Sequence, residues 1–323
     1  MLSVEDLSVE FRTRAGVVKA LEAVNFSVQP GETVGIVGES GSGKSVTAFT
    51  LMGVLDRAGQ VTAGRALFQS NRVAVDLLKE SESSLRQLRG QELSMIFQNP
   101  RTALNPIRQV GKQITDVLRC HSDLPPADLR LKALEMLASV RIPDPVKRYE
   151  AYPYELSGGL CQRIMIALAL ACSPELLIAD EPTTGLDVTT QTTVMNLLKD
   201  LAAQRQMATV LITHDLALAS EYCDRIVVMH AGHVVESAPT HSLFSQPRHP
   251  YTAKLIAATP EPHKSFAELM PIGGNLPDLK AMDLAPCRFS TRCDRFDSAL
   301  CGQTPLKRAA LAPDHQVACW QPL

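Results

Sequence analysis

The tetrapeptide Leu156-Ser157-Gly158-Gly159 lies between two halves of a nucleotide site in this chain of 323 residues. Upstream, residues 38–45 read Gly-Glu-Ser-Gly-Ser-Gly-Lys-Ser and match the phosphate-binding pattern G-x-x-x-x-G-K-[ST] at every specified position. Downstream, the apolar residues 176–179 run into the carboxylates Asp180 and Glu181. The phosphate loop alone indicates only that the chain binds a nucleotide. The order of loop, Leu-Ser-Gly-Gly and paired acids narrows the class of protein considerably.

The loop at 38–45 is expected to hold phosphates, because its glycines let successive backbone N–H groups converge on oxygens at a helix N-terminus. An apolar strand predicted at 33–37 leads into the loop, and a helix predicted from Lys44 to residue 52 leaves it, as the motif requires. Lys44 supplies a cation for the β- and γ-phosphates, and the Ser45 hydroxyl ligates Mg²⁺. The predicted nucleotide-binding residues of the loop are Gly38, Ser40, Gly41, Ser42, Gly43, Lys44 and Ser45.

Asp180 ends an apolar run, so we expect it at the carboxyl end of a strand, where a carboxylate holds Mg²⁺ directly or through water. Further strands are predicted at 7–11, 176–178 and 208–213, with a hairpin formed by 225–230 and 233–236. Alternation of strands and helices indicates a largely parallel sheet with its ligand at the carboxyl ends of the strands.

Helices are predicted between the phosphate loop and the acid pair, and in two later segments. After the Pro125-Pro126 break, apolar residues recur at helical spacing through 134, 137 and 138 to Arg141. Residues 190–201 are predicted to form another helix. The proline-rich segment after residue 237 is predicted to be a linker with one short helix at 251–258.

In this order the motifs resemble the ATP-binding subunits of ABC transporters. The resemblance implies an α/β P-loop ABC ATPase core with a largely parallel sheet, an antiparallel N-terminal β part and a helical subdomain, followed by a small cysteine-bearing C-terminal extension. The core would span 1–237, with the helical subdomain at about 99–173, and a linker with the extension would span 238–323. The implied cofactors are ATP and Mg²⁺.

The resemblance also implies roles for residues outside the phosphate loop. Glu181 resembles the general base that polarises the attacking water, and His214 resembles the histidine that contacts the γ-phosphate. Gln98 resembles the glutamine that senses Mg²⁺ and links to the membrane subunit. Asp187 follows the acids in a loop that touches the opposite subunit. Phe11 lies where the family stacks an aromatic ring on adenine, although a place in the core of a strand is an alternative.

Ser157, Gly158 and Gly159 resemble the family signature, which presents N–H groups at a helix N-terminus to the γ-phosphate of ATP bound by a partner subunit. Each ATP site would therefore be shared across a dimer. The next two positions, Leu160 and Cys161, depart from the usual residues of the family. Because backbone donors do not depend on these side chains, we expect the function to survive.

Composition limits the classes of protein that fit. Hydrophobic residues make up 45% of the chain, enough for a sizeable core, and a net charge of −2 argues against nucleic-acid binding. The longest apolar run, 164–172, is far shorter than the roughly 20 residues that span a bilayer, and no secretory signal is visible. We therefore expect a soluble protein, peripheral at the cytoplasmic face of the inner membrane and held there by its partners.

Residues beyond 240 resemble one branch of the family, the dipeptide and oligopeptide importer ATPases, at 246–252, 271–277 and 287–293. The resemblance implies an ATP-hydrolysing motor for peptide import, whose ATP-dependent dimerisation drives alternating access of the permease. The implied partners are a second ABC ATPase subunit (a paralogue), two transmembrane permease subunits and an extracytoplasmic substrate-binding protein. Import of nickel or another metal chelate is the alternative. A soluble ABC ATPase of DNA repair or translation, and a P-loop kinase or GTPase-like switch, fit less well.

Four of the eight cysteines fall in the last 37 residues, with the spacing C-x5-C-x7-C-x17-C. In a reducing compartment such a cluster more often holds metal than disulfides, but the close pairs typical of zinc sites are absent. Some relatives hold a [4Fe–4S] cluster in this extension, and four thiolates suit one. We expect the cluster first, zinc second and uncoordinated thiols third. Because the cysteines lie far along the chain from the ATP loops, we expect no direct part in hydrolysis. The four are Cys287, Cys293, Cys301 and Cys319.

Overall fold

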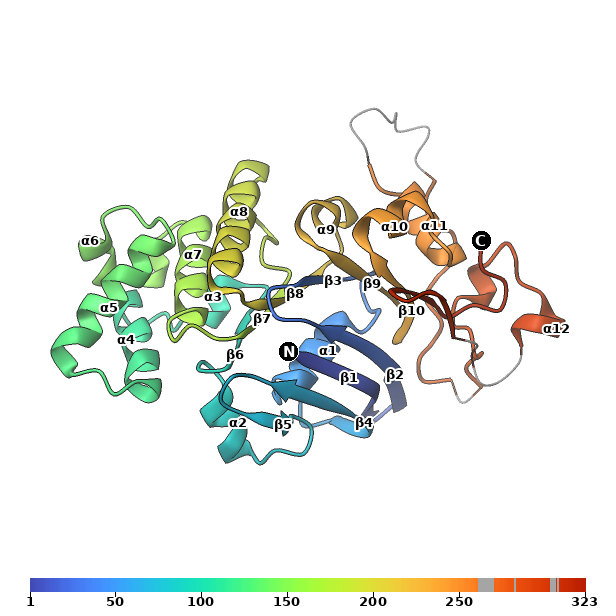
Figure 1. Cartoon of the computed structure of the whole chain (residues 1–323), viewed down its shortest axis with the longest axis horizontal. Coiled ribbons are helices and arrows are strands. Elements are labelled where there is room, and N and C mark those ends of the chain that lie inside the picture. The colour runs from blue at the N-terminus through green and yellow to red at the C-terminus, as the bar shows by residue number, and fades with distance from the viewer. Residues whose placement is uncertain (261–269, 282, 303–305, 307) are drawn as a thin grey trace.

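The computed structural model describes residues 1–260, 270–281, 283–302, 306 and 308–323, which form two β-sheets with helices around them (Figure 1). The smaller sheet is antiparallel, as expected for the N-terminal part, and its strand order is β2-β1-β4-β5. Its strands are β1 (Leu2–Thr13), β2 (Gly16–Val28), β4 (Gly59–Gln69) and β5 (Ala74–Asp76).

The larger sheet has the strand order β11-β12-β10-β9-β3-β8-β7-β6. The five strands from β9 to β6 run parallel, whereas β10, β12 and β11 are antiparallel to their neighbours. The predicted hairpin is present as β9 and β10. The strands of this sheet are β3 (Thr33–Val37), β6 (Leu93–Ile96), β7 (Leu176–Asp180), β8 (Ala208–Thr213), β9 (Arg225–His230), β10 (His233–Pro239), β11 (Ala309–Ala312) and β12 (His315–Val317).

The parallel strands separate two hydrophobic cores, and every residue of β7 and β8 is buried. Leu177 and Ala179 belong to the core on the helical side, whereas Leu176 and Ile178 belong to the core between the two sheets. Successive side chains of a strand point to opposite faces, so an uninterrupted apolar run is what a strand covered on both faces requires.

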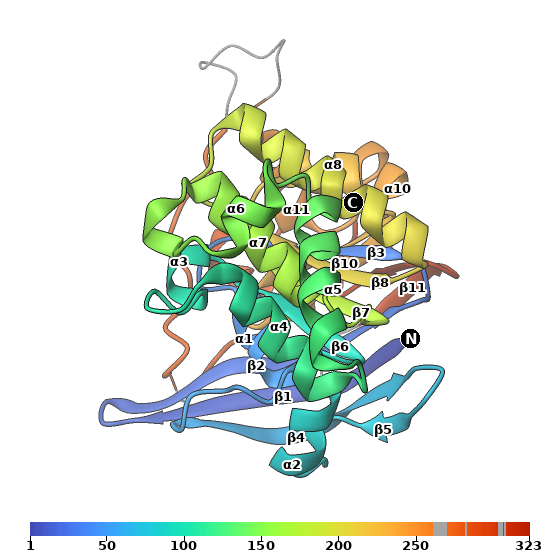
Figure 2. The ribbon, with the colours of Figure 1, turned by 90° about the vertical axis from the view of Figure 1, so that its left-hand side faces the viewer.

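The helices gather mainly on one side of the larger sheet, as Figure 2 shows. The helix predicted after Pro125-Pro126 ends at Ser139, two residues before the predicted end at Arg141. The helix does not continue to Arg141 because the φ of this residue is +58°, outside the right-handed helical region. The helices are α1 (Lys44–Leu51), α2 (Glu82–Leu88), α3 (Pro100–Ala103), α4 (Val110–His121), α5 (Pro126–Ser139), α6 (Pro145–Tyr149), α7 (Gly158–Ala169), α8 (Val188–Arg205), α9 (Leu216–Tyr222), α10 (Thr240–Ser245), α11 (Pro250–Ala257) and α12 (Ser298–Cys301).

Residues 238–260 contain two helices, α10 and α11, where the sequence predicted one in the linker, and a further short helix, α12, lies in the C-terminal part. A six-residue helix is too short to show a hydrophobic period, which explains the omission. The C-terminal part then returns to the larger sheet, since β12 pairs with β10 in the register Glu236↔Val317. Among the residues that the structure describes, no helix is both long and apolar enough to span a bilayer.

Candidate active site

Four neighbouring parallel strands end at the predicted site. The phosphate loop follows β3, His214 follows β8, the acids end β7, and Gln98 lies two residues after β6. In the sheet these strands are adjacent, in the order β3-β8-β7-β6. Because the carboxyl ends of parallel strands meet at one edge, residues separated by up to 176 positions along the chain lie close together.

Hydrogen bonds join the predicted residues into two adjacent sets. The Ser45 hydroxyl donates to Asp180 Oδ1 at 3.1 Å, and Gln98 Nε2 donates to Glu181 Oε2 at 2.8 Å. The Nδ1 atom of His214 lies 3.0 Å from the other oxygen of Glu181. The two sets of partners are adjacent because Asp180 and Glu181 are consecutive residues at the end of β7.

Lys44 opens helix α1 and turns its ammonium back over the loop. Its Nζ donates to the carbonyl oxygens of Gly38 and Glu39 at 2.8 and 3.0 Å. Burial lowers the pKa of Lys44, against the attraction of Glu181 and Asp180. Burial also raises the pKa of Asp180, whose side chain faces the Ser45 hydroxyl. A buried ammonium and a buried carboxylate beside a helix N-terminus make this edge suited to a phosphate group together with a divalent cation.

Glu181 has a strained backbone and three hydrogen-bond partners. Its φ is +46°, a conformation that non-glycine residues adopt mainly where the surroundings enforce it. Burial acts to raise the pKa of Glu181, but hydrogen bonds from His214 and Thr184 outweigh it, and the pKa is lowered. The residue is therefore an ionised carboxylate held in a fixed direction, as a general base requires.

The Leu-Ser-Gly-Gly segment begins helix α7 and lies beside the loop that follows the acids. Ser157 caps the helix by accepting from the Leu160 N–H. A Cβ atom added to Gly159 would stand 2.7 Å from Thr190 Cγ2, so any larger residue here would require the Thr190 side chain or α7 to shift. Asp187 accepts hydrogen bonds from Thr190 and caps α8. In Figure 1, α7 stands with the helical group at the left, whereas α1 lies near the middle against the strands.

Phe11 lies on β1, half-buried at the edge of the core between the sheets. A Cβ atom added to Gly59, which pairs with Phe11, would lie 2.9 Å from the phenyl ring. The absence of a side chain at Gly59 leaves room for the Phe11 ring. This position is compatible with stacking on adenine and with a place in the core of the strand, so adenine stacking stays a prediction.

The four C-terminal cysteines line one cavity of about 20 Å³, although they are spread over 33 residues. Burial, with a smaller contribution from the other three thiols, raises the pKa of Cys287 to about 11. All four are free thiols. Within the described ranges, however, no group of three or more histidine, cysteine or acidic side chains is close enough to hold a metal ion. The other residues around the cavity include His249, Phe289, Phe296 and Trp320.

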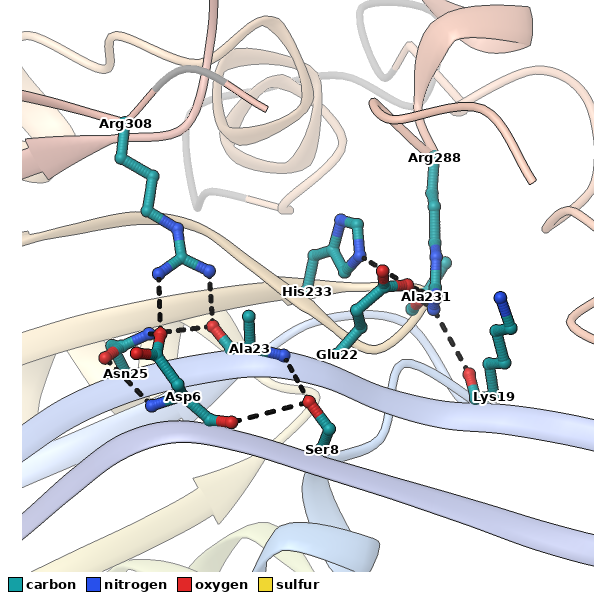
Figure 3. A network of polar contacts seen from close by, with 10 residues as sticks. All are labelled: Asp6, Ser8, Lys19, Glu22, Ala23, Asn25, Ala231, His233, Arg288 and Arg308. Carbon is teal, nitrogen blue, oxygen red and sulfur yellow. Dashed lines mark hydrogen bonds and ion pairs between the residues drawn. The ribbon is translucent and has the colours of Figure 1, made fainter. Parts of the chain in front are cut away.

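Two arginines of the C-terminal part bind the N-terminal sheet, as Figure 3 shows. Arg288 donates to Glu22 and to the carbonyl of Ala231, and its side chain is 1% exposed. Arg308 donates to the carbonyl of Ala23. No sequence pattern predicts these contacts, because each joins residues more than 50 positions apart and an isolated arginine has no distinctive pattern.

A third arginine reaches the phosphate loop itself. Arg292, one position before Cys293, makes a two-pronged ion pair with Glu39 at 2.8 and 2.9 Å. The C-terminal part, which lies far along the chain from the ATP loops, is therefore in direct contact with one of them. The contact is possible because α11 and β12 bring this segment back onto the core.

Comparison with known proteins covers the whole chain. The profile of the ABC transporter family matches residues 21–184, and that of the oligopeptide/dipeptide transporter C-terminal region matches residues 235–301. The chain is 43% identical to the oligopeptide transport ATP-binding protein OppD of Salmonella typhimurium, over 100% of this chain and 94% of the relative. It is also 43% identical to the dipeptide transport ATP-binding protein DppD of Escherichia coli, over 100% and 97%.

Among solved structures, the dimeric ATP-binding cassette MJ0796, in a post-hydrolysis state bound to ADP and Pi, is similar with a TM-score of 0.66. It is 26% identical, over 74% of this chain and 99% of that chain. The part of this chain beyond that likeness is comparable in size to the C-terminal region that the second family profile matches.

Proposed function

Because this chain belongs to the ABC transporter ATP-binding family, with the C-terminal region of its oligopeptide/dipeptide branch, we propose that it is the ATP-hydrolysing subunit of a membrane importer for di- or oligopeptides. The observation that carries the proposal is the convergence of four adjacent strand ends on two neighbouring hydrogen-bonded sets, one at Asp180 and one at Glu181. A binding module without catalysis has no need for a fixed carboxylate beside the phosphate loop.

The loop 38–45 binds the phosphates of ATP through its N–H groups and the start of α1. Lys44, which now donates to two loop carbonyls, turns to the β- and γ-phosphates. Ser45, Asp180 and Gln98 offer a hydroxyl, a carboxylate and an amide, the oxygen ligands that Mg²⁺ prefers. The donor set thus fits the cation that accompanies ATP.

Glu181 orients the attacking water and takes its proton. His214 holds the Glu181 carboxylate in place and also contacts the γ-phosphate. The start of α7 and Asp187 belong to neither of the two hydrogen-bonded sets. We assign them to the ATP of a second subunit, so that two subunits close around two nucleotides. A likeness to the dimeric cassette MJ0796 supports this assignment. Closure and reopening on hydrolysis would drive the permease between its inward-facing and outward-facing states.

The proposed partners are a paralogous ATPase subunit, two permease subunits and a substrate-binding protein, which place the chain at the cytoplasmic face of the membrane. We divide the chain into a nucleotide-binding domain at 1–237, with its helical subdomain at about 99–173, and an extension at 238–323. The Arg288, Arg292 and Arg308 contacts indicate that the extension is docked on the domain rather than tethered to it.

We also propose that the four cysteines of the extension hold a [4Fe–4S] cluster, with zinc as the second choice. Their common cavity supports the proposal, since four thiols from separate segments meet there. The thiols would have to approach one another to ligate a metal, because their present spacing forms no metal-binding group among the described residues. Such a centre would cross-link a segment with little core of its own.

The test is transport by the complete complex in vesicles, with ATP supplied on the side of this chain. Uptake of a labelled di- or tripeptide should require ATP and be lost with Lys44→Ala. A matched control is Lys79→Ala, which removes an exposed lysine that pairs with Asp76 of β5. Uptake of a nickel chelate in place of peptide would establish the alternative substrate. ATP hydrolysis without uptake of either would contradict the transport function.

A further inference from the structure

The segment 287–293 reads Cys-Arg-Phe-Ser-Thr-Arg-Cys, and its two arginines reach the ATPase domain in different places. Arg288 binds β2 and the turn between β9 and β10 (Figure 3). Arg292 binds the phosphate loop. The two cysteines at the ends of the segment line the cavity described above. One short segment therefore joins the cysteine cavity to the nucleotide site.

Arg292 is a buried residue whose hydrogen-bonding capacity is well used. Its side chain is 2% exposed, and both terminal nitrogens contact the two carboxylate oxygens of Glu39. Its Nε donates to the carbonyl of Gly273 at 2.9 Å, and its guanidinium lies over the Phe289 ring at 5.7 Å. A planar guanidinium that is fixed on all sides holds a carboxylate in one direction.

Glu39 is the second residue of the phosphate loop, and the extension holds it from two sides. Its side chain meets Arg292, and its N–H donates to the Tyr251 hydroxyl of helix α11 at 3.1 Å. Its carbonyl accepts from Lys44 Nζ, the ammonium that serves the phosphates. The extension therefore holds a residue whose carbonyl is one of the two that accept from the Lys44 ammonium.

The charge of Glu39 also matters for ATP. The Arg292 hydrogen bonds lower the pKa of this carboxyl, so it is ionised at neutral pH. A free carboxylate one residue from Gly38 would repel the phosphates, whereas a paired one contributes little net charge. The ion pair thus removes a penalty at the place where the nucleotide binds.

We propose that Arg292 of the extension is a positioning residue for ATP binding, which acts through Glu39 by fixing the phosphate loop and neutralising its carboxylate. It touches no phosphate itself. The inference rests on the proposed function, since it concerns the ATP site of the same subunit. It makes the extension part of the nucleotide site and not only an appendage.

The experiment is a double-mutant cycle in the full-length chain, with the affinity for a fluorescent ATP analogue as the readout. Arg292→Met keeps much of the side-chain volume without the charge, and Glu39→Gln keeps the shape of its partner. We expect Arg292→Met, which leaves the Glu39 carboxylate unpaired, to weaken binding about tenfold. Glu39→Gln, which loses the positioning contact but leaves no unpaired carboxylate, should weaken binding less, and the double variant should bind no more weakly than Arg292→Met alone. Arg292→Lys, which restores charge without the two-pronged geometry, should recover part of the loss.

Arg308→Ala is the matched control, because Arg308 also ties the extension to the domain but contacts Ala23 and Asp6 instead of the loop. Its affinity should stay within about twofold of the parent. Thermal unfolding of every variant identifies those that fold. If Arg292→Met does not fold, the two single variants Glu39→Gln and Arg292→Lys provide the comparison.

Unchanged ATP affinity in folded Arg292→Met and Glu39→Gln would overturn the inference, as would losses that simply add in the double variant. An equal loss in Arg308→Ala would also overturn it, since the effect would then come from docking in general. Lys44→Ala separates this result from the function itself. If Lys44→Ala abolishes ATP binding, the proposed ATP site is supported regardless of the result for Arg292. If Lys44→Ala leaves ATP binding intact, both the proposed function and the proposed role of Arg292 fail.

Discussion

Replacing Glu181 by glutamine tests the proposed base with a small change of shape. In the structure its carboxylate accepts from Gln98 at 2.8 Å and from Thr184 at 2.9 Å, and lies 3.0 Å from His214 Nδ1. Glutamine keeps one oxygen acceptor in this arrangement but cannot take a proton. The change therefore separates the geometry of the site from its basicity.

A positioned general base contributes about 10²- to 10⁴-fold to rate, so turnover by Glu181→Gln should fall by that factor, or about 2.7–5.4 kcal/mol in activation free energy. ATP affinity should not fall, because the negative charge that is removed lies beside the phosphate site and close to Lys44. A loss of turnover with retained binding is the signature of an interaction made in the transition state.

The assay measures phosphate release and bound ATP in the complete complex with its membrane subunits. Glu135→Gln is the control, since Glu135 is an exposed residue of α5 that pairs with Lys132. It should leave both quantities unchanged. Turnover by Glu181→Gln at the parental rate would show that the base lies elsewhere. A parallel loss of ATP binding would show that Glu181 serves the ground state instead.

Three further predictions concern other parts of the chain. Gly159→Ala should weaken ATP-dependent dimerisation without lowering the ATP affinity of the single subunit, because the added methyl would displace Thr190; dimerisation at the parental level would contradict this. Anaerobically purified protein should show the visible absorbance of an iron–sulfur cluster, lost in Cys293→Ser, and colourless protein would refute the cluster. The pKa of Glu22 is lowered from 4.5 to about 2, first by its hydrogen bond to His233, so its stabilising contribution is complete above pH 4.5 and declines as pH falls toward 2. Acid unfolding of Glu22→Gln should lack this component; an identical pH profile would exclude it.

The sequence predicted that the candidate site residues lie at the ends of strands, but it did not predict their hydrogen-bond partners. Asp180, His214 and Gln98 each follow an apolar run, and parallel strands must end at a common edge. The strand order β3-β8-β7-β6 determines which of these side chains become neighbours, and no local sequence pattern contains that order. The hydrogen bond from Gln98 to Glu181 across 83 positions could therefore be expected only from the family resemblance.

The C-terminal part was harder to predict, for a physical reason. Its elements are short, and β12 has only three residues, so periodicity carries almost no information there. Besides the β12–β10 pairing, its attachment uses single arginines, of which Arg288 and Arg292 are buried. The ion pair of Arg292 with Glu39 joins residues 253 positions apart, and neither residue differs in sequence from an ordinary surface charge.

The contacts at Glu39 link two equilibria that the sequence presents as separate. The extension holds the phosphate loop through Arg292 and Tyr251, and Leu276 would lie 3.4 Å from a Cβ atom on Gly41. If docking of the extension favours ATP binding, thermodynamic reciprocity requires that ATP favour docking by the same factor. Anything that loosens the cysteine cavity beside Arg292 must then lower ATP affinity, even though no cysteine touches the nucleotide. The extension consequently acts on ATP through binding energy and need supply no group to the chemistry of hydrolysis.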